Sequence, residues 1–201
     1  MEEAGKYWTL GNLVDAKHSA RDLPFSGGLY TERLRLRRLI ESDAAAIQHM
    51  VSNWEVAKQT MSFPNPYTLD HALKFIQSTE SEWKAGTQFV LGMERVRDSV
   101  LIGAVSATVS RRFLKRQAEV GYWIGEEFWG QGLTSEAMDI FLEFCRKGLG
   151  LTAMTARVFA ENEASLRLLE NQGFSIHRRR TEHLPDRGGA RKIIHLRSRK
   201  K

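Results

Sequence analysis

The chain has 201 residues, of which 42% are hydrophobic, and this length and composition are typical of one globular domain with a sizeable core. It contains no run near the roughly 18 apolar residues that a membrane-spanning helix needs, and residues 1–20 lack the basic-then-apolar order of a secretory signal. These observations argue against a membrane protein and predict a cytoplasmic one, either a monomer or a homodimer.

The formal net charge of +6 is unevenly distributed along the chain. Residues 177–201 carry ten Lys or Arg side chains and two carboxylates, whereas the rest of the chain is close to neutral. A basic end of this kind is typical of a protein that contacts nucleic acid or an acidic protein, and it is equally typical of a solvated terminal hairpin.

The domain is predicted to begin after a loosely ordered extension. Residues 1–28 show no clear hydrophobic period and contain Pro24 and a glycine pair, so we place the folded domain at 29–198 and a basic tail at 199–201. In residues 34–40, Leu alternates with Arg, which predicts a strand with one buried face. Ser42 is then expected to cap the first helix.

The middle of the chain changes from helical to strand-like periodicity. Thr68 is predicted to cap a second helix that ends at Gly86. The buried stripe of this helix is expected to contain Leu69, Leu73, Ile76 and Trp83. Three strand-like segments follow at 88–96, 100–110 and 117–125, and the short polar turns between them predict an antiparallel meander with the apolar second segment in its centre.

The stretch WGQGLTSEA, residues 129–137, joins the third of these strands to a helix predicted over 135–147. Glycines at such a junction let backbone N–H groups and the positive end of a helix dipole meet at one point, which suits a phosphate or pyrophosphate. A tight turn gives the same pattern, so both interpretations stay open. Cys145, at helical spacing from Phe141, is interpreted as a small core residue rather than a catalytic thiol.

The last part of the chain predicts another strand and helix, followed by a hairpin. The strand covers residues 151–160, and Asn162 is expected to cap a helix that Gly173 stops. Two strands at 173–182 and 191–198 then flank a turn at 186–189. The order of elements indicates a single α+β domain.

Four blocks of the sequence together resemble a known family. In chain order they are TERLRLRRL, IGAVSATV, AEVGYWIGEEFWGQGLTSEAM and NEASLRLLENQGF. At these spacings they are similar to the GNAT acetyltransferases, and within them to the RimJ/RimL group of ribosomal-protein N-acetyltransferases. The resemblance covers roughly residues 31–174. It implies a three-layer α+β fold with a mixed, mainly antiparallel central sheet flanked by helices, and acetyl-CoA bound where two neighbouring strands splay apart.

The resemblance also implies a set of cofactor-binding residues. The pyrophosphate loop of the family, Q/R-x-x-G-x-G/A, falls on residues 129–134 with Gly132 at the fixed glycine. Trp129 stands at the Gln/Arg position, so the loop would bind through backbone N–H groups rather than a guanidinium, while the backbone of residues 122–124 would pair with the pantetheine amides. The residues implied in acetyl-CoA binding are Tyr122, Trp123, Ile124, Trp129, Gly130, Gln131, Gly132, Leu133, Thr134, Asn162 and Ser165.

Two residues are candidates for catalysis by the same resemblance. Glu119 would be the base that deprotonates the amine, although a strand glutamate is commonly just a solvated side chain. Ser165 lies near the thioester sulfur in this family, and many members carry a tyrosine four residues later, where this chain has Leu169. The proton donor to the thiolate would then be Ser165 or a water, or no acid would be needed. A backbone N–H of residues 123–124 would stabilise the acetyl oxygen.

The acceptor implied by the resemblance is the α-amine of a protein N-terminus, with the basic end available to ribosomal RNA or an acidic partner. The same group includes enzymes that act on small amines such as antibiotics, polyamines and amino acids, which is the first alternative. The second alternative is a CoA- or RNA-binding module without turnover. For Asn162, the alternative to a ligand contact is a role as a helix cap, and it can fill both roles at once. No metal is expected, because the histidines are scattered.

Overall fold

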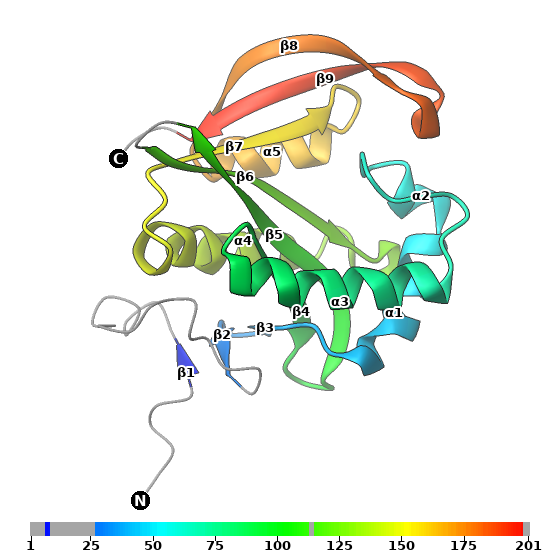
Figure 1. The fold of residues 1–201 in the computed structure, drawn as a ribbon, viewed down its shortest axis with the longest axis vertical. Helices are drawn as coiled ribbons and strands as arrows, with labels where there is room; N and C mark the ends of the chain where they lie inside the picture. Colours follow the sequence, from blue (N-terminus) through cyan, green and yellow to red (C-terminus); the bar gives the residue numbers. More distant parts are fainter. Residues whose placement is uncertain (1–6, 9–26, 113–114, 199–201) are drawn as a thin grey trace, which may run out of the picture.

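A computed structural model describes residues 7–8, 27–112 and 115–198 (Figure 1). Its strands are β1 (Tyr7–Trp8), β2 (Gly28–Tyr30), β3 (Leu34–Arg37), β4 (Gln88–Arg95), β5 (Val100–Arg112), β6 (Lys115–Ile124), β7 (Ala153–Phe159), β8 (Phe174–Leu184) and β9 (Gly189–Ser198). Within the described residues these nine strands form one sheet in the order β1-β2-β3-β4-β5-β6-β7-β9-β8. The sheet is antiparallel except where β1 meets β2 and where β6 meets β7.

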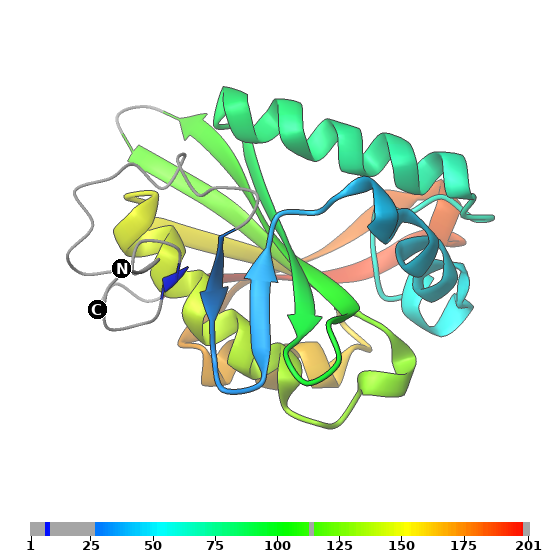
Figure 2. The same cartoon turned by 90° about the horizontal axis from the view of Figure 1, so that it is seen from below.

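Helices cover both faces of this sheet. They are α1 (Ala44–Ser52), α2 (Trp54–Ala57), α3 (Leu69–Ala85), α4 (Leu133–Glu143) and α5 (Glu163–Asn171). Figure 2 shows α1 and α3 on one face and α4 and α5 on the other, so the molecule has three layers. This arrangement confirms the predicted α+β fold with a mixed, mainly antiparallel sheet, and the meander β4-β5-β6 lies where the sequence predicted it.

The start of the domain differs from the expectation at Arg37 and at Ser42. Arg37, expected on a solvent face of β3, is only 7% exposed. Its Nη1 and Nη2 donate to the Asp43 carboxylate at 2.8 and 2.9 Å, and its Nε donates to Glu94. The prediction that Ser42 caps the first helix is wrong, because Ser42 lies within the preceding turn and Asp43 occupies the cap position. Asp43 also accepts the Ile40 N–H, so one carboxylate organises this corner.

The second predicted helix forms almost as expected. The Thr68 hydroxyl accepts the backbone N–H of His71 at the start of α3, and Gly86 ends the helix in the left-handed conformation with φ 69°. Leu69, however, is 48% exposed, so its place on the buried stripe was wrong. It lies in the first turn of α3.

The ends of the chain lie largely outside the described residues. Of the predicted extension over 1–28, Tyr7–Trp8 pairs in parallel with Gly28 and Leu29, which adds a short strand that the sequence did not predict. Residues 199–201, predicted as a basic tail, lie outside the described part of the chain.

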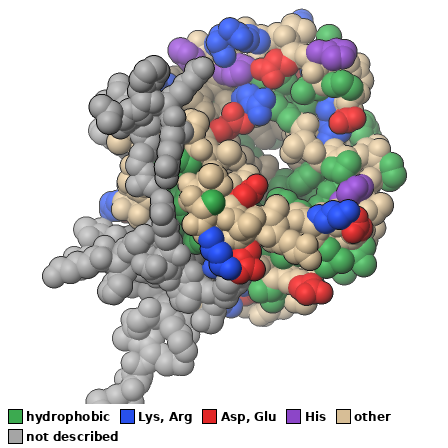
Figure 3. Space-filling model, in the orientation of Figure 1, with side chains coloured by type: hydrophobic (Ala, Val, Ile, Leu, Met, Phe, Trp, Pro, Cys, Tyr) green, Lys and Arg blue, Asp and Glu red, His purple; other side chains and the backbone are tan. Residues whose placement is uncertain are grey.

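The hairpin β8-β9 carries the basic side chains predicted near the carboxyl end. Strand β8 is at the edge of the sheet, and Arg178, Arg179 and Arg180 are exposed on it. Basic and acidic side chains lie next to each other over the upper part of the molecule in Figure 3, where the hairpin is located. The hairpin therefore presents these three arginines to solvent, and contact with RNA or an acidic protein stays a prediction.

Candidate functional site

A gap in the sheet lies between β6 and β7. The two strands pair only over Gln117–Glu119 and Ala153–Thr155, after which β7 pairs with β9 and the strands diverge (Figure 1). The Gly125 N–H donates to the Ile102 carbonyl at 2.9 Å, and hydrogen-bonded pairs alternate along an antiparallel ladder. The backbone groups of Tyr122 and Ile124 therefore point into the gap.

This alternation separates the residues that sequence reasoning treated together. The backbone of Trp123 points toward β5, so Trp123 is left with its side chain as its contribution to the site. Tyr122 and Ile124 have N–H groups directed into the gap. Of the two residues expected to donate to the acetyl oxygen, Trp123 and Ile124, only Ile124 has an N–H group that does not point toward β5.

The glycine loop leads from the gap directly into α4. Gly130 and Gly132 have φ angles of 71° and 73°, a left-handed conformation that glycine adopts without strain. Gly132 is the N-cap residue without a side-chain cap, and the first helical bond runs from the Glu136 N–H to the Gly132 carbonyl. The first-turn N–H groups of α4 are thus available to an anion.

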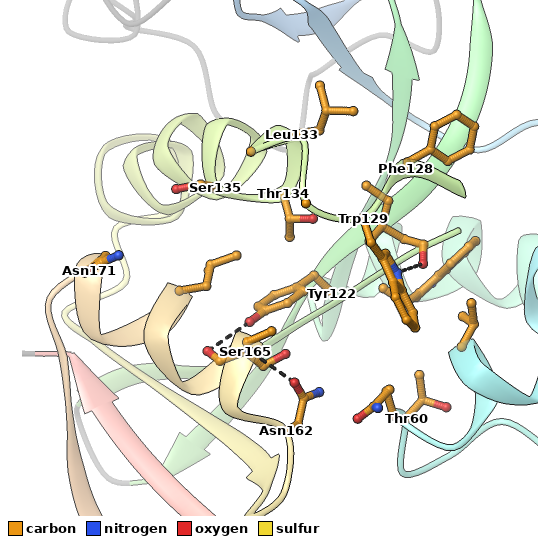
Figure 4. Close-up of a pocket in the computed structure, with 18 residues that line it drawn as sticks. Thr60, Tyr122, Phe128, Trp129, Leu133, Thr134, Ser135, Asn162, Ser165 and Asn171 are labelled. Carbon is orange, nitrogen blue, oxygen red and sulfur yellow. Dashed lines mark hydrogen bonds between the residues drawn. The ribbon is translucent and has the colours of Figure 1, made fainter. Parts of the chain in front are cut away.

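A cavity of about 390 Å³ opens beside these N–H groups, and we refer to it as the larger cavity (Figure 4). The predicted cofactor residues that line it are Tyr122, Trp123, Ile124, Trp129, Gly130, Gly132, Leu133, Thr134, Asn162 and Ser165. Gln131 is the exception, because its carboxamide donates to the Glu127 carbonyl at 3.0 Å. A cavity with uncapped helix N–H groups at its wall fits the phosphates of acetyl-CoA.

Trp129 takes a different role from the Gln or Arg that the family pattern prefers. Its indole N–H donates to the Ile124 carbonyl at 3.1 Å, across the base of the loop. The indole therefore holds the loop against the end of β6. It also uses the Ile124 carbonyl as its acceptor, so this carbonyl is not free to bind a ligand in the gap. This contact agrees with a loop that binds phosphate through its backbone.

A brace that the sequence analysis missed holds the loop from outside. The Glu136 carboxylate accepts hydrogen bonds from the Thr31 hydroxyl and from the N–H and Nε of Arg33. Arg33 Nη1 also donates to the Gln131 carbonyl at 3.0 Å. Although burial alone would raise it, these hydrogen bonds hold the pKa of Glu136 below its ordinary value. The guanidinium neutralises a carboxylate that would otherwise oppose an anion at this helix end.

The start of α5 faces the loop across the larger cavity (Figure 4). Asn162 Oδ1 accepts the Ser165 N–H at 3.0 Å, which confirms the predicted helix cap. The Tyr122 hydroxyl donates to the Ser165 carbonyl at 3.3 Å, and burial raises the pKa of Tyr122 to about 12. Leu169 is buried in the core, so this position supplies no proton donor.

A second cavity, of about 290 Å³, lies on the face of the sheet that carries Glu119 and Trp123, and we refer to it as the smaller cavity. Glu119 is 42% exposed there, and its Oε1 accepts from Arg157 Nε at 2.9 Å. The same guanidinium lies 3.4 Å from Glu182, whose other oxygen is 2.8 Å from His195. The predicted base is thus placed in a cavity, as one end of a charged row.

Aromatic side chains also line the smaller cavity. The Phe63 ring lies 5.9 Å from the Trp123 ring and 6.3 Å from the Phe75 ring, both in edge-to-face geometry. Four residues line both cavities. They are Gln59, Thr60, Tyr122 and Trp123. The two cavities therefore meet at the gap beside β6, and the loop at 59–63 was the part that sequence reasoning missed.

Residues 33–175 match the family described as acetyltransferase (GNAT) domain. This match spans more than half of the chain and confirms the resemblance found in the four sequence blocks. The chain belongs to the GNAT family of acetyltransferases. The uncharacterized N-acetyltransferase YoaA of Bacillus subtilis (strain 168) is 34% identical to this GNAT N-acetyltransferase over 146 residues, which are 73% of the chain and 81% of the relative.

Solved structures share the fold. The ribosomal-protein-S5-alanine acetyltransferase from Vibrio fischeri superposes with a TM-score of 0.77 and 20% identity over 87% of this chain and 97% of that one. RimJ of Mycobacterium smegmatis, solved in complex with CoA-disulfide, gives a TM-score of 0.73 and 20% identity over 82% of this chain and 80% of its own. GNAT proteins with this fold thus bind CoA.

The structure also bears on Cys145, on metal-binding side chains and on membrane-spanning helices. Cys145 is fully buried, and burial raises the pKa of its thiol, which confirms its place in the core. In residues 7–8, 27–112 and 115–198 no three His, Cys, Asp or Glu side chains are grouped so that they could hold a metal ion. None of the helices in this part of the chain is long and apolar enough to cross a membrane.

Proposed function

We propose that this GNAT enzyme transfers the acetyl group of acetyl-CoA to the α-amine at the N-terminus of a protein or peptide. The observation that carries the proposal is the pair of cavities that meet at Tyr122 and Trp123. Acetyl-CoA would occupy the larger cavity, with its phosphates at the N–H groups of α4, and the acceptor would occupy the smaller one. The thioester would then lie at the gap, within reach of both.

The transfer needs a free amine next to the thioester carbonyl. An amine reaches this point as an ammonium and must lose a proton before it attacks, which is the role we assign to Glu119, directly or through a water. A C–N bond then forms, the C–S bond breaks, and the electron pair stays on sulfur. The Ile124 N–H would stabilise the carbonyl oxygen. The thiolate takes a proton from a water or from the Ser165 hydroxyl, which in turn receives the second proton that the nitrogen loses as the amide forms.

The charges of the smaller cavity favour one class of acceptor. Glu119 and Glu182 flank the single guanidinium of Arg157, so the row carries a net negative charge when His195 is neutral. Such a site attracts an ammonium and disfavours an acceptor with a carboxylate close to its amine. A peptide N-terminus has no such carboxylate, whereas a free amino acid does.

The aromatic wall adds a second preference. Phe63, Phe75 and Trp123 offer apolar surface beside the proposed amine position. An acceptor whose first side chain is apolar would bury that side chain here, and burial of one such side chain contributes roughly 1.5–3 kcal/mol. We therefore propose a peptide with an apolar first residue, in the cytoplasm, as the acceptor class.

Matched acceptors test this proposal. Labelled acetyl-CoA would be incubated with a peptide that begins with Leu, with leucine itself and with spermidine, and labelled product would be followed together with free CoA. Transfer to the peptide at a kcat/KM at least about tenfold above that for leucine is expected from charge selection. Transfer only to leucine or spermidine would overturn the chain-end acceptor, and tight CoA binding without any transfer would favour a binding module.

A further inference from the structure

A buried arginine lies in the turn between β8 and β9. Arg187, in the short helical turn Pro185–Arg187, is only 2% exposed, whereas Arg178, Arg179 and Arg180 on the same hairpin are exposed. Burial lowers the pKa of Arg187. A buried guanidinium is costly unless its N–H groups find acceptors, so the partners of this side chain indicate what it holds.

Three backbone carbonyls accept from Arg187, two of them in a distant loop, and the Thr60 hydroxyl oxygen lies 3.5 Å from its Nη2. Its Nε donates to the Thr60 carbonyl at 2.7 Å, and its Nη2 donates to the Phe63 carbonyl. Its Nη1 donates to the Asp186 carbonyl at 2.7 Å, within the turn itself. One rigid, planar fork thus joins the tip of the hairpin to the loop that connects α2 to α3. Figures 1 and 2 both show these segments side by side.

The clamped loop forms part of both cavities. Thr60 lines the larger and the smaller cavity, and Phe63 supplies the ring that packs against Trp123 and Phe75. Because Arg187 holds the carbonyls of these two residues, it fixes the backbone from which the aromatic wall projects. No residue of the hairpin tip needs to enter a cavity for this effect.

The hairpin tip is itself anchored. Arg191 Nη1 donates to the Arg187 carbonyl at 3.0 Å, and its guanidinium lies 4.6 Å from the centre of the Phe159 ring, at the end of β7. Arg191 also forms an ion pair with Glu161, the residue before the cap of α5. The contacts of Arg191 therefore hold the hairpin tip against β7 and the start of α5, so the tip can restrain the loop that Arg187 binds.

We propose that Arg187 is a positioning residue that sets the shape of the smaller cavity and so determines how well the acceptor binds. The identity of the occupant rests on the proposed function, whereas the clamp rests on the contacts alone. Without the fork, the loop at 60–63 loses its three hydrogen bonds to Arg187, and the aromatic side chains lose their fixed distance from Glu119. The N–H groups of α4, which lie on other elements, are untouched.

The test compares R187M and R187K with R179M, which removes an exposed arginine from the same hairpin. With the Leu peptide as acceptor, R187M is expected to raise the acceptor KM by about tenfold, while the dissociation constant for acetyl-CoA changes by less than about twofold. R187K should fall between R187M and the wild type, because an ammonium lacks the planar fork that spans two carbonyls. R179M should match the wild type.

Hydrogen exchange separates the clamp from the proposed function. Amides of residues 60–67 should exchange faster in R187M than in the wild type, while those of α4 stay unchanged. This comparison needs no acceptor, so it decides the clamp even if the wild type acetylates none of the peptides. Unchanged exchange at 60–67, an unchanged acceptor KM, or an equal rise in the acceptor KM and the acetyl-CoA dissociation constant would each overturn the positioning role.

Discussion

The larger and the smaller cavity are built in opposite ways. The larger one takes its key groups from two short segments, residues 122–135 and 162–165, and many of these groups are backbone atoms. The smaller one collects side chains from the loop at 59–63 and from α3, β4, β5, β6 and β7. A site made from local backbone tolerates variation of its side chains, as Trp129 illustrates. A site made from distant side chains changes with each of them.

This difference suits the two substrates proposed for the enzyme. Backbone N–H groups at a helix end suffice to bind the phosphates of acetyl-CoA. The acceptor would be selected by side chains such as Phe63 and Arg157, which line the smaller cavity and not the larger one. Variants that affect one cavity and spare the other therefore test the comparison.

The largest effect is expected from Gly132→Glu. The new side chain would strain a backbone with φ 73° and place a negative charge beside the first-turn N–H groups of α4. Acetyl-CoA affinity should fall by about 100-fold or more in calorimetric titration. Gly173→Glu is the matched control, since Gly173 also has a left-handed φ, of 81°, and open space around it. Similar losses in both variants would contradict the loop as the phosphate site.

The next effect concerns the proposed base. Glu119→Gln should lower kcat by about 10²-fold, a usual range for general-base catalysis, and leave acetyl-CoA affinity unchanged. The loss should be greatest at low pH, because at high pH free amine is present without the help of a base. Glu182→Gln is the control for the charge of the row, since Glu182 contacts the same arginine without lining either cavity; it should raise the acceptor KM and leave kcat unchanged. Equal losses across the pH range would remove Glu119 as the base.

A pair of phenylalanines can separate the two cavities directly. Phe63 lines only the smaller cavity and Phe128 only the larger one. Phe63→Ala is expected to raise the acceptor KM by about tenfold, and Phe128→Ala to weaken acetyl-CoA by a similar factor, from lost apolar contact. Initial rates measured while the concentrations of both substrates are varied would separate the change in acceptor KM from the change in acetyl-CoA KM. Crossed or equal effects would mean that the cavities do not divide the substrates.

The smallest effect is a pH dependence of stability at the brace. The folded-state pKa of Glu136 is held below its ordinary value, so its contribution is complete above the unfolded-state pKa and disappears as the pH falls through the folded-state pKa. Glu136→Gln should therefore cost about 1 kcal/mol near pH 7 and less in acid. Urea unfolding at both pH values measures this, with Glu163→Gln as an exposed control. A difference in unfolding free energy between wild type and Glu136→Gln that does not change with pH would contradict this prediction.

The sequence predicted those parts of the molecule whose causes are local. The glycine loop, the cap at Asn162 and the meander follow from neighbouring residues, and the structure has each of them. Two of the four family blocks, at 118–138 and 162–174, cover the segments that form the larger cavity, so the resemblance also indicated the candidate cofactor residues. By the period of two along β6, Glu119 shares a face with Trp123, and its role as the base stays a prediction.

The parts that escaped prediction depend on partners far along the chain. Arg37 can be buried because it forms ion pairs with Asp43 and Glu94. The alternation of Leu and Arg does not predict these partners. Arg187 and the loop it clamps are more than 120 residues apart, and Arg33 meets Glu136 only after folding. Such contacts are specified by tertiary packing, so propensity and periodicity do not show them.

The central claim is that the two substrates meet at the gap from separate cavities. A crystal structure of the enzyme with CoA and the Leu peptide tests it most directly. The account predicts the pyrophosphate at hydrogen-bond distance from the N–H groups of Leu133 and Thr134, the sulfur beside Tyr122, and the peptide amine between Glu119 and the sulfur. CoA bound away from the loop, or a peptide bound outside the smaller cavity, would contradict it.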